Sequence, residues 1–133
     1  MPYLLDTNIL SALMRNPGGR IAARIAQPEI EVCTSIIVVA ELKYGLAKTR
    51  SQRLSTQLAA ILEGLDVVPF ETPADVAYAE IRAHLERTGR PIGANDLLIA
   101  AHALALDLTL VTDNEREFSR IPDLRIENWL RGS

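Results

Sequence analysis

Residues 2–10, PYLLDTNIL, decide the fold, because a short apolar run ends there on a carboxylate. Residues 3–5 predict a buried strand, and Thr7 or Asn8 is expected to cap the helix that follows. Asp6 would then lie at the carboxyl end of a strand, where ligands gather in an open parallel sheet. The alternative is that these polar residues form only a helix cap. The positions of the other acidic residues decide between the two interpretations.

The length and composition indicate one globular domain spanning residues 1–133, with 48% hydrophobic and 23% charged residues. No apolar run is long enough to cross a membrane, since the longest candidate, 97–111, is broken by His102 and Asp107. No export signal is recognisable, and the single cysteine, Cys33, cannot form an internal disulfide. We therefore expect a cytoplasmic protein with a buried thiol.

The net charge of −3 argues against broad electrostatic binding to nucleic acid. Local binding remains open, because all the cations but Lys43 and Lys48 are arginines, whose planar fork suits phosphate and carboxylate groups. We expect most of these arginines to lie on solvated helix faces.

Strands and helices alternate along the chain. Apolar runs predict strands at 3–5, 31–34, 67–70, 108–112 and 124–127. Helical spacing predicts helices near 9–13, 21–26, 35–48, 54–65, 72–88, 96–106 and 114–118. The alternation predicts a mainly parallel sheet in a three-layer α/β sandwich, and Pro69 favours an edge position for its strand.

Glu41 lies on the inward side of its predicted helix, together with Ile37 and Val38. A buried carboxylate is costly unless it is paired, protonated or bound to a metal. Gly45 falls on the same side and costs roughly 1 kcal/mol relative to alanine, which suggests close approach by another element. The alternative is that Glu41 lies at the edge of the apolar stripe and reaches water or Lys48.

Two further acidic segments are expected at the same sheet edge. Asn95 can cap helix 96–106, and Asp96 is directed toward the strand ends, although an acid there also favours the helix dipole. Asp113, Asn114 and Glu117 follow the strand 108–112, where Asp113 or Asn114 can be a plain cap and Glu117 a solvent-facing residue. The convergence of acids from separate segments is the best-supported feature of the sequence.

An all-oxygen cluster selects Mg²⁺ or Mn²⁺ over zinc. His84 and His102 are expected to have packing or surface roles, because each lies within a helical pattern. The sequence has no activated Ser-His pair, phosphate-binding GxxxxGK loop or CxxC motif. Chemistry that uses a metal-activated water therefore fits best.

Four segments of the chain, in order, resemble the PIN-domain family and, within it, the VapC-type toxin ribonucleases of bacterial toxin–antitoxin pairs. They are LLDTN at 4–8, VAELKYG at 39–45, RPIGANDLLIAAHA at 90–103 and LVTDNEREF at 110–118. The resemblance implies a five-stranded parallel sheet in the order 3-2-1-4-5 and Mg²⁺-dependent RNA cleavage. It also implies a homodimer and inhibition by a small VapB-type antitoxin.

By this resemblance, Asp6, Glu41 and Asp96 occupy three acidic metal-site positions, with Thr7 and Asn8 as additional candidates. Many PIN domains have a fourth acid two residues after the threonine, where this chain has Asn114. Asp113 and Glu117 flank that position, and either can serve. We favour Glu117, because three helical residues beyond Asn114 turn it back toward the cluster, while Asp113 is well placed to cap.

Three rival functions share some of these features. Aspartate-nucleophile phosphatases also place an Asp after the first strand but need a second acid two residues later, where this chain has Asn8. A response-regulator receiver needs an Asp at the end of its third strand, where this chain reads VPFE at 68–71. A non-catalytic binding module would have a decayed site, against which the three intact acids argue.

Overall fold

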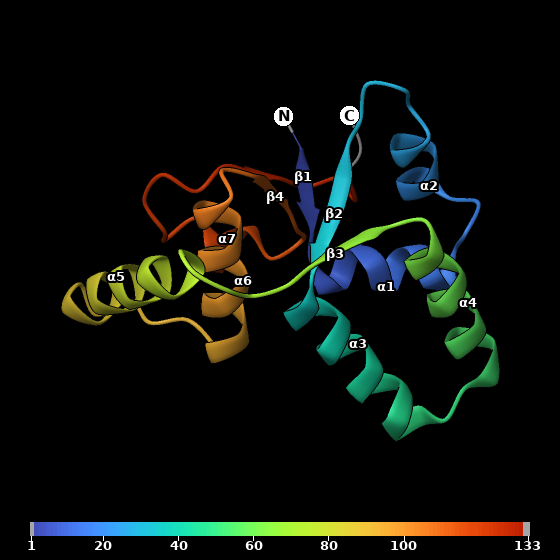
Figure 1. Cartoon of the computed structure of the whole chain (residues 1–133), viewed down its shortest axis with the longest axis horizontal. Coiled ribbons are helices and arrows are strands. Elements are labelled where there is room, and N and C mark those ends of the chain that lie inside the picture. Colours follow the sequence, from blue (N-terminus) through green and yellow to red (C-terminus); the bar gives the residue numbers. More distant parts are fainter. Residues whose placement is uncertain (1, 132–133) are drawn as a thin grey trace.

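The computed structural model describes residues 2–131, whose strands form one parallel sheet. The strands are β1 (Tyr3–Leu5), β2 (Val32–Ser35), β3 (Asp66–Val68), β4 (Thr109–Val111) and β5 (Ile126–Glu127). Their order, β3-β2-β1-β4-β5, confirms the expected topology and places β1 and β4 side by side at the centre (Figure 1). β3 lies at an edge, as Pro69 indicated, and the strand ends just before this proline.

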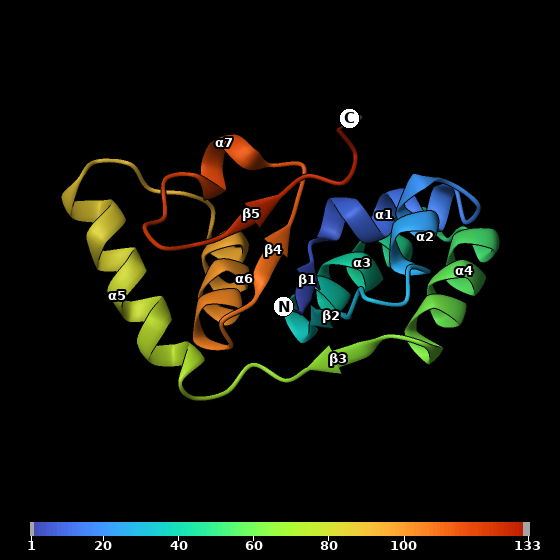
Figure 2. The ribbon, with the colours of Figure 1, turned by 90° about the horizontal axis from the view of Figure 1, so that it is seen from above.

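Helices connect the strands and lie on both sides of the sheet. They are α1 (Thr7–Arg15), α2 (Arg20–Ile25), α3 (Ile36–Thr49), α4 (Gln52–Glu63), α5 (Ala74–Arg87), α6 (Ala94–Ala105) and α7 (Glu115–Phe118). Figure 2 shows α1, α2 and α4 grouped at one side of the molecule and α5 with α6 at the other. This arrangement is the three-layer sandwich that the alternation of elements predicted.

The core forms where α6 packs on the central strands. Leu4, Leu110, Ile99 and Ala100 are completely buried. Small alanines on the inner face of α6 let the helix approach the sheet closely, and the central strands carry mainly apolar side chains, as expected where both faces of a strand are covered. Cys33 is buried as expected, and its burial raises the pKa of the thiol to about 11.

Two helices begin earlier than the sequence indicated. Asp6, and not Thr7 or Asn8, caps α1, since its side chain accepts a hydrogen bond from the backbone N–H of Thr7 at 2.8 Å. All three residues are good caps, and the helix starts directly after the strand. α6 begins at Ala94 after Gly93, so Asn95 lies inside the first turn with its side chain free for another contact.

Two further observations concern the helices. The expected close approach to Gly45 is wrong, because a Cβ placed there would meet no atom within 4 Å. Gly45 therefore faces open space on α3.

Within residues 2–131, no helix has the length and apolar character needed to cross a membrane.

The central position of Leu110 makes it a test of the core. Leu110→Ala should lower the free energy of unfolding by about 2–5 kcal/mol, because it leaves a cavity in the core. Leu110 lies in β4, which pairs with β1 on one side and β5 on the other. Leu106→Ala is the matched control, since Leu106 is 40% exposed at the end of α6 and its truncation should cost less than about 1 kcal/mol. Urea unfolding of both variants gives the comparison, and equal losses would contradict this description of the core.

Candidate metal centre

The register of the two central strands places Asp6 beside Thr112. Leu5 pairs with Val111, so the residues that follow them lie next to each other at the end of the sheet. The Thr112 hydroxyl donates a hydrogen bond of 2.7 Å to one Asp6 oxygen, and the Thr7 N–H donates to the other. Asp6 is only 4% exposed. Burial raises the pKa of its carboxyl, and the two hydrogen bonds act in the opposite direction.

Glu41 reaches the same place from α3. The Thr7 hydroxyl donates a hydrogen bond to one of its oxygens, and Asn95 Nδ2 donates to the other at 3.0 Å. Residues on α1 and α6 therefore hold this carboxylate between them. It is not paired with Lys48, whose ammonium group lies over the ring of Tyr44 at 4.8 Å.

Asn114 joins the remaining two carboxylates. Its Nδ2 donates to Asp96 Oδ2 at 3.2 Å and to Glu117 Oε2 at 3.3 Å. The pKa of Asp96 rises to about 7. Burial is the largest cause, followed by a hydrogen bond with the Glu117 carboxyl and by the negative charges of Asp6, Glu117 and Glu41. Four acids from different elements therefore act on one another at this sheet edge.

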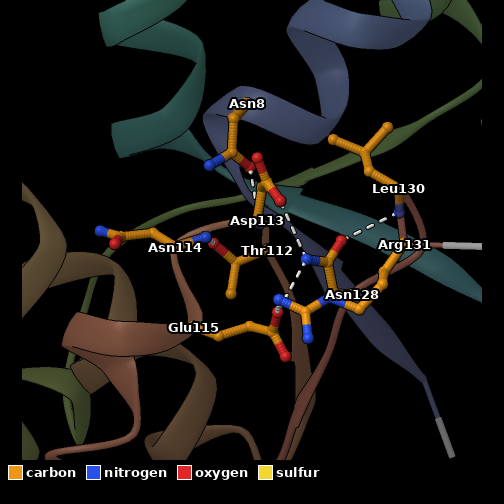
Figure 3. Close-up of polar contacts among 8 residues, drawn as sticks. All are labelled: Asn8, Thr112, Asp113, Asn114, Glu115, Asn128, Leu130 and Arg131. Carbon is orange, nitrogen blue, oxygen red and sulfur yellow. Dashed lines mark hydrogen bonds and ion pairs between the residues drawn. The ribbon is translucent and has the colours of Figure 1, made fainter.

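Asp113 lies outside this group of acids. Its backbone N–H donates to Asn8 Oδ1 at 3.2 Å, and its carboxylate accepts from Asn128 Nδ2 at 2.9 Å (Figure 3). Asp113 does not cap α7 either, since the N-cap is Asn114, which makes no side-chain capping bond. Of the two expected caps, Asp113 is therefore wrong, because its carboxylate is bound by the C-terminal segment, while Asn114 occupies the cap position. Asn8 holds the backbone of the loop and does not contact the four acids.

The donor set suits a hard divalent cation. Asp6, Glu41, Asp96 and Glu117 offer only carboxylate oxygens, and no ion pair within residues 2–131 involves any of them. In the arrangement that the structure shows for residues 2–131, no three His, Cys, Asp or Glu side chains could together hold a metal ion. Neutral donors hold the carboxylates instead, so their negative charge remains available to a cation such as Mg²⁺.

The two histidines have no part in this group. His102 is 1% exposed, with Nδ1 2.8 Å from the Ser35 hydroxyl and its ring edge-on to Phe70. Burial lowers its pKa and keeps it neutral. His84 lines an open groove between α5 and α6. The expected packing and surface roles are confirmed.

Sequence reasoning assigned no role in the site to three residues that the structure places in it or beside it. Thr112 could have been found by aligning the ends of β1 and β4, because the same register places it beside Asp6. Asn95 was expected only as a cap. Asn128 gave no signal, because its contacts join the C-terminal segment to a loop fifteen residues earlier in the chain.

Comparison with known proteins gives the family. Residues 3–124 match the PIN domain. The chain belongs to the PIN-domain family. This membership confirms the resemblance seen in the four sequence motifs.

Several PIN-domain relatives match over almost the whole chain. Ribonuclease VapC2 of Rickettsia felis is 40% identical over 132 residues, covering 97% of this chain and 98% of the relative. The tRNA(fMet)-specific endonuclease VapC of Salmonella typhimurium is 36% identical over 130 residues, covering 97% and 98%. Among solved structures, VapBC2 from Rickettsia felis, bound to a DNA fragment from the promoter, aligns with a TM-score of 0.88 and 38% identity, covering 97% of this chain and 99% of that one.

The raised pKa of Asp96 gives a prediction for the PIN domain without metal. A carboxyl whose pKa is higher in the folded than in the unfolded protein stabilises fully below pH 4, and this stabilisation is lost as the pH rises toward about 7. An asparagine at this position does not ionise, so Asp96→Asn does not lose stability in this way as the pH rises. In EDTA, its melting temperature relative to wild type should therefore increase between pH 4 and 7.

The control is the response to metal. Mg²⁺ bound only by the folded state raises stability by about 2.7 kcal/mol at a hundredfold excess over Kd. Asp96→Asn should reduce this shift. A variant that melts well below wild type in EDTA at pH 7 and keeps the full Mg²⁺ shift would make Asp96 a structural residue of the helix start.

Proposed function

We propose that this chain is a divalent-metal-dependent endoribonuclease of the VapC type, in which Asp6, Glu41, Asp96 and Glu117 form the catalytic centre. One observation carries the proposal: four carboxylates meet at one sheet edge without a cationic partner among the described residues. An arrangement that leaves so much negative charge unpaired is destabilising unless a cation binds there. Relatives named ribonuclease and tRNA endonuclease support the choice of reaction.

The cofactor in this proposal is Mg²⁺ or Mn²⁺, held by Asp6, Glu41 and Asp96, with Glu117 completing the centre. When bound, such an ion attracts the phosphodiester oxygens and acidifies water, so that hydrolysis proceeds near neutral pH. The chain itself orients the carboxylates. Thr112 fixes Asp6, and Asn114 fixes the relative positions of Asp96 and Glu117.

A proton near Asp96 is the second contribution of the chain. Burial and the neighbouring carboxylates raise the pKa of Asp96 to about 7, so without a cation this carboxyl is partly protonated near neutral pH. Asp96 would release this proton if it held a cation, because a nearby positive charge favours the ionised carboxylate. Glu117, held by the Asn114 amide, would offer its carboxylate oxygens beside this site, where they can accept a hydrogen bond from a water molecule.

We further propose that the partners are an RNA substrate, a small VapB-type antitoxin and a second copy of the chain, and that the protein works in the cytoplasm. VapBC complexes among the similar structures support the antitoxin. Transfer RNA is the first substrate class to test, because the Salmonella relative is named as a tRNA endonuclease. The phosphatase alternative loses support, because Asn8 holds the Asp113 backbone where such an enzyme needs its second acid.

The reaction is tested by incubating the purified chain with total tRNA and with ribosomal RNA, in Mg²⁺ and in EDTA. Cleavage should require the metal, and Asp96→Asn should lower the rate by at least about 100-fold. A parallel assay with p-nitrophenyl phosphate covers the phosphatase alternative. Phosphate release without RNA cleavage would support that alternative, and inactivity in both assays would support a non-catalytic binding module.

The fourth acid is tested by comparing Glu117→Ala with Asp113→Ala. Glu117→Ala should reduce RNA cleavage by at least about 100-fold, because it removes a carboxylate from the proposed centre. Asp113→Ala should remain within about tenfold of wild type, since that carboxylate contacts Asn128 instead. Mg²⁺ titrations of the cleavage rate provide the measurement. A larger loss for Asp113→Ala would assign the fourth position to Asp113.

A further inference from the structure

Asn128 makes three hydrogen bonds that fix the orientation of its amide. Its Nδ2 donates to Asp113 Oδ1 at 2.9 Å and to Glu115 Oε2 at 3.0 Å, while its Oδ1 accepts from the backbone N–H of Leu130 at 2.9 Å (Figure 3). Carboxylates only accept, and a backbone N–H only donates. A rotated amide would lose all three bonds, so only one orientation satisfies every partner.

The two carboxylates that Asn128 holds lie on either side of Asn114. Figure 3 shows Asp113 directed toward Asn8 and Asn128, while Asn114 extends to the other side of the loop. The Asn114 N–H also donates to the Thr112 hydroxyl at 3.0 Å. The backbone on both sides of Asn114 is therefore fixed, and its side chain faces the acids that it bridges.

The segment that carries Asn128 is itself anchored on the body of the protein. Trp129 is 5% exposed and lies edge-on to the ring of Tyr3 in β1, with centroids 5.1 Å apart. The Arg24 guanidinium covers the indole at 4.9 Å, and Arg20 donates to the Leu130 carbonyl at 2.8 Å. A side chain on such a support can hold a loop in one position.

The contacts of Asn128 with Asp113 and Glu115 also affect where negative charge lies around the centre. Asp113 and Glu115 are two more acids beside a centre that already gathers four carboxylates. Asn128 binds both, and Arg131 pairs with Glu115 at 2.8 Å. Their carboxylates therefore contact the C-terminal segment rather than the centre.

We propose that Asn128 is a positioning residue of the metal centre. By holding Asp113 and Glu115, it fixes Asn114 where the Asn114 amide joins Asp96 to Glu117. Asn128 touches neither the cation nor the RNA, so it acts through the loop. This inference rests on the proposed function, because the position of the loop matters for metal binding only if the four acids bind a metal.

Asn128→Asp tests the inference with a side chain of the same shape. An aspartate cannot donate, so it would face Asp113 and Glu115 as a third negative charge. Removing an outer partner of a metal ligand costs about 10–100-fold in metal affinity or activity. Asn128 lies one contact further from the cation than such a partner, so we expect the Kd for Mn²⁺, measured by calorimetry, to rise by about tenfold, at the lower end of this range. The kcat for RNA cleavage at fixed Mg²⁺ should fall while KM for RNA stays unchanged.

Two further variants isolate the contact. Gln52→Glu adds the same charge at an exposed position in the first turn of α4 and should bind Mn²⁺ like wild type. Asp113→Asn combined with Asn128→Asp exchanges donor and acceptor, so the amide introduced at the first position would donate to the carboxylate introduced at the second. This double variant should recover part of the lost Mn²⁺ affinity, as coupled neighbours do in a double-mutant cycle, but not all of it, because the contact with Glu115 stays repulsive.

The outcomes separate this inference from the proposed function. A wild-type chain that neither binds Mn²⁺ nor cleaves RNA refutes the proposed function. If wild type does both, unchanged Mn²⁺ affinity in Asn128→Asp overturns the positioning role, even where its melting temperature falls. Loss of Mn²⁺ binding in Asp113→Asn alone also overturns it, since Asp113 would then be a ligand. If Asn128→Asp does not fold, Asn128→Ala takes its place, and wild-type affinity in that variant refutes the inference.

Discussion

The burial of the Asp6 carboxylate is the constraint on which the site depends. A carboxylate with 4% exposure loses most of its hydration, and specific hydrogen bonds compensate for part of that loss. These hydrogen bonds come from the Thr112 hydroxyl and the Thr7 N–H. The position of Asp6 is therefore fixed both by the β1–β4 pairing and by the start of α1. A slip of one residue between the strands would separate Asp6 from Thr112. The register of two short central strands therefore determines where Asp6 lies among the four acids.

The acids at this edge are held by neutral donors. Thr7 and Asn95 hold Glu41, and Asn114 holds Asp96 with Glu117. An arginine in any of these positions would stabilise the protein by pairing with a carboxylate, but it would also consume the charge that binds a cation. Hydroxyl and amide groups fix the directions of the oxygens and leave their charge in place. The apolar core beneath the site offsets the resulting repulsion.

Much of the fold could be predicted from the sequence, because it follows from hydrophobic periodicity. The convergence of Asp6 and Asp96 followed from the end of the first strand, which places Asp6, and from the alanine face of α6, which directs Asp96 toward the strand ends. The helix starts were harder, because several adjacent residues were equally good caps and the choice depended on tertiary contacts of Asp6 and Asn95. Gly45 misled the prediction, since a glycine in a helix does not require a close neighbour. Asn128 was inaccessible to periodicity, because its contacts depend on how the C-terminal segment returns beside the β4–α7 loop.

The same arrangement explains how a PIN domain can keep one chemistry while its substrates differ. All four acids lie directly after a strand or within the first two turns of a helix, so the sheet topology defines their positions. An RNA phosphate approaching this edge meets carboxylates on a chain of net charge −3, and a bound cation is needed to reverse that repulsion. Attraction at the centre then depends on charge and does not distinguish one RNA from another. Selection of an RNA must therefore come from surfaces outside the acidic centre, which can change without disturbing the strand ends.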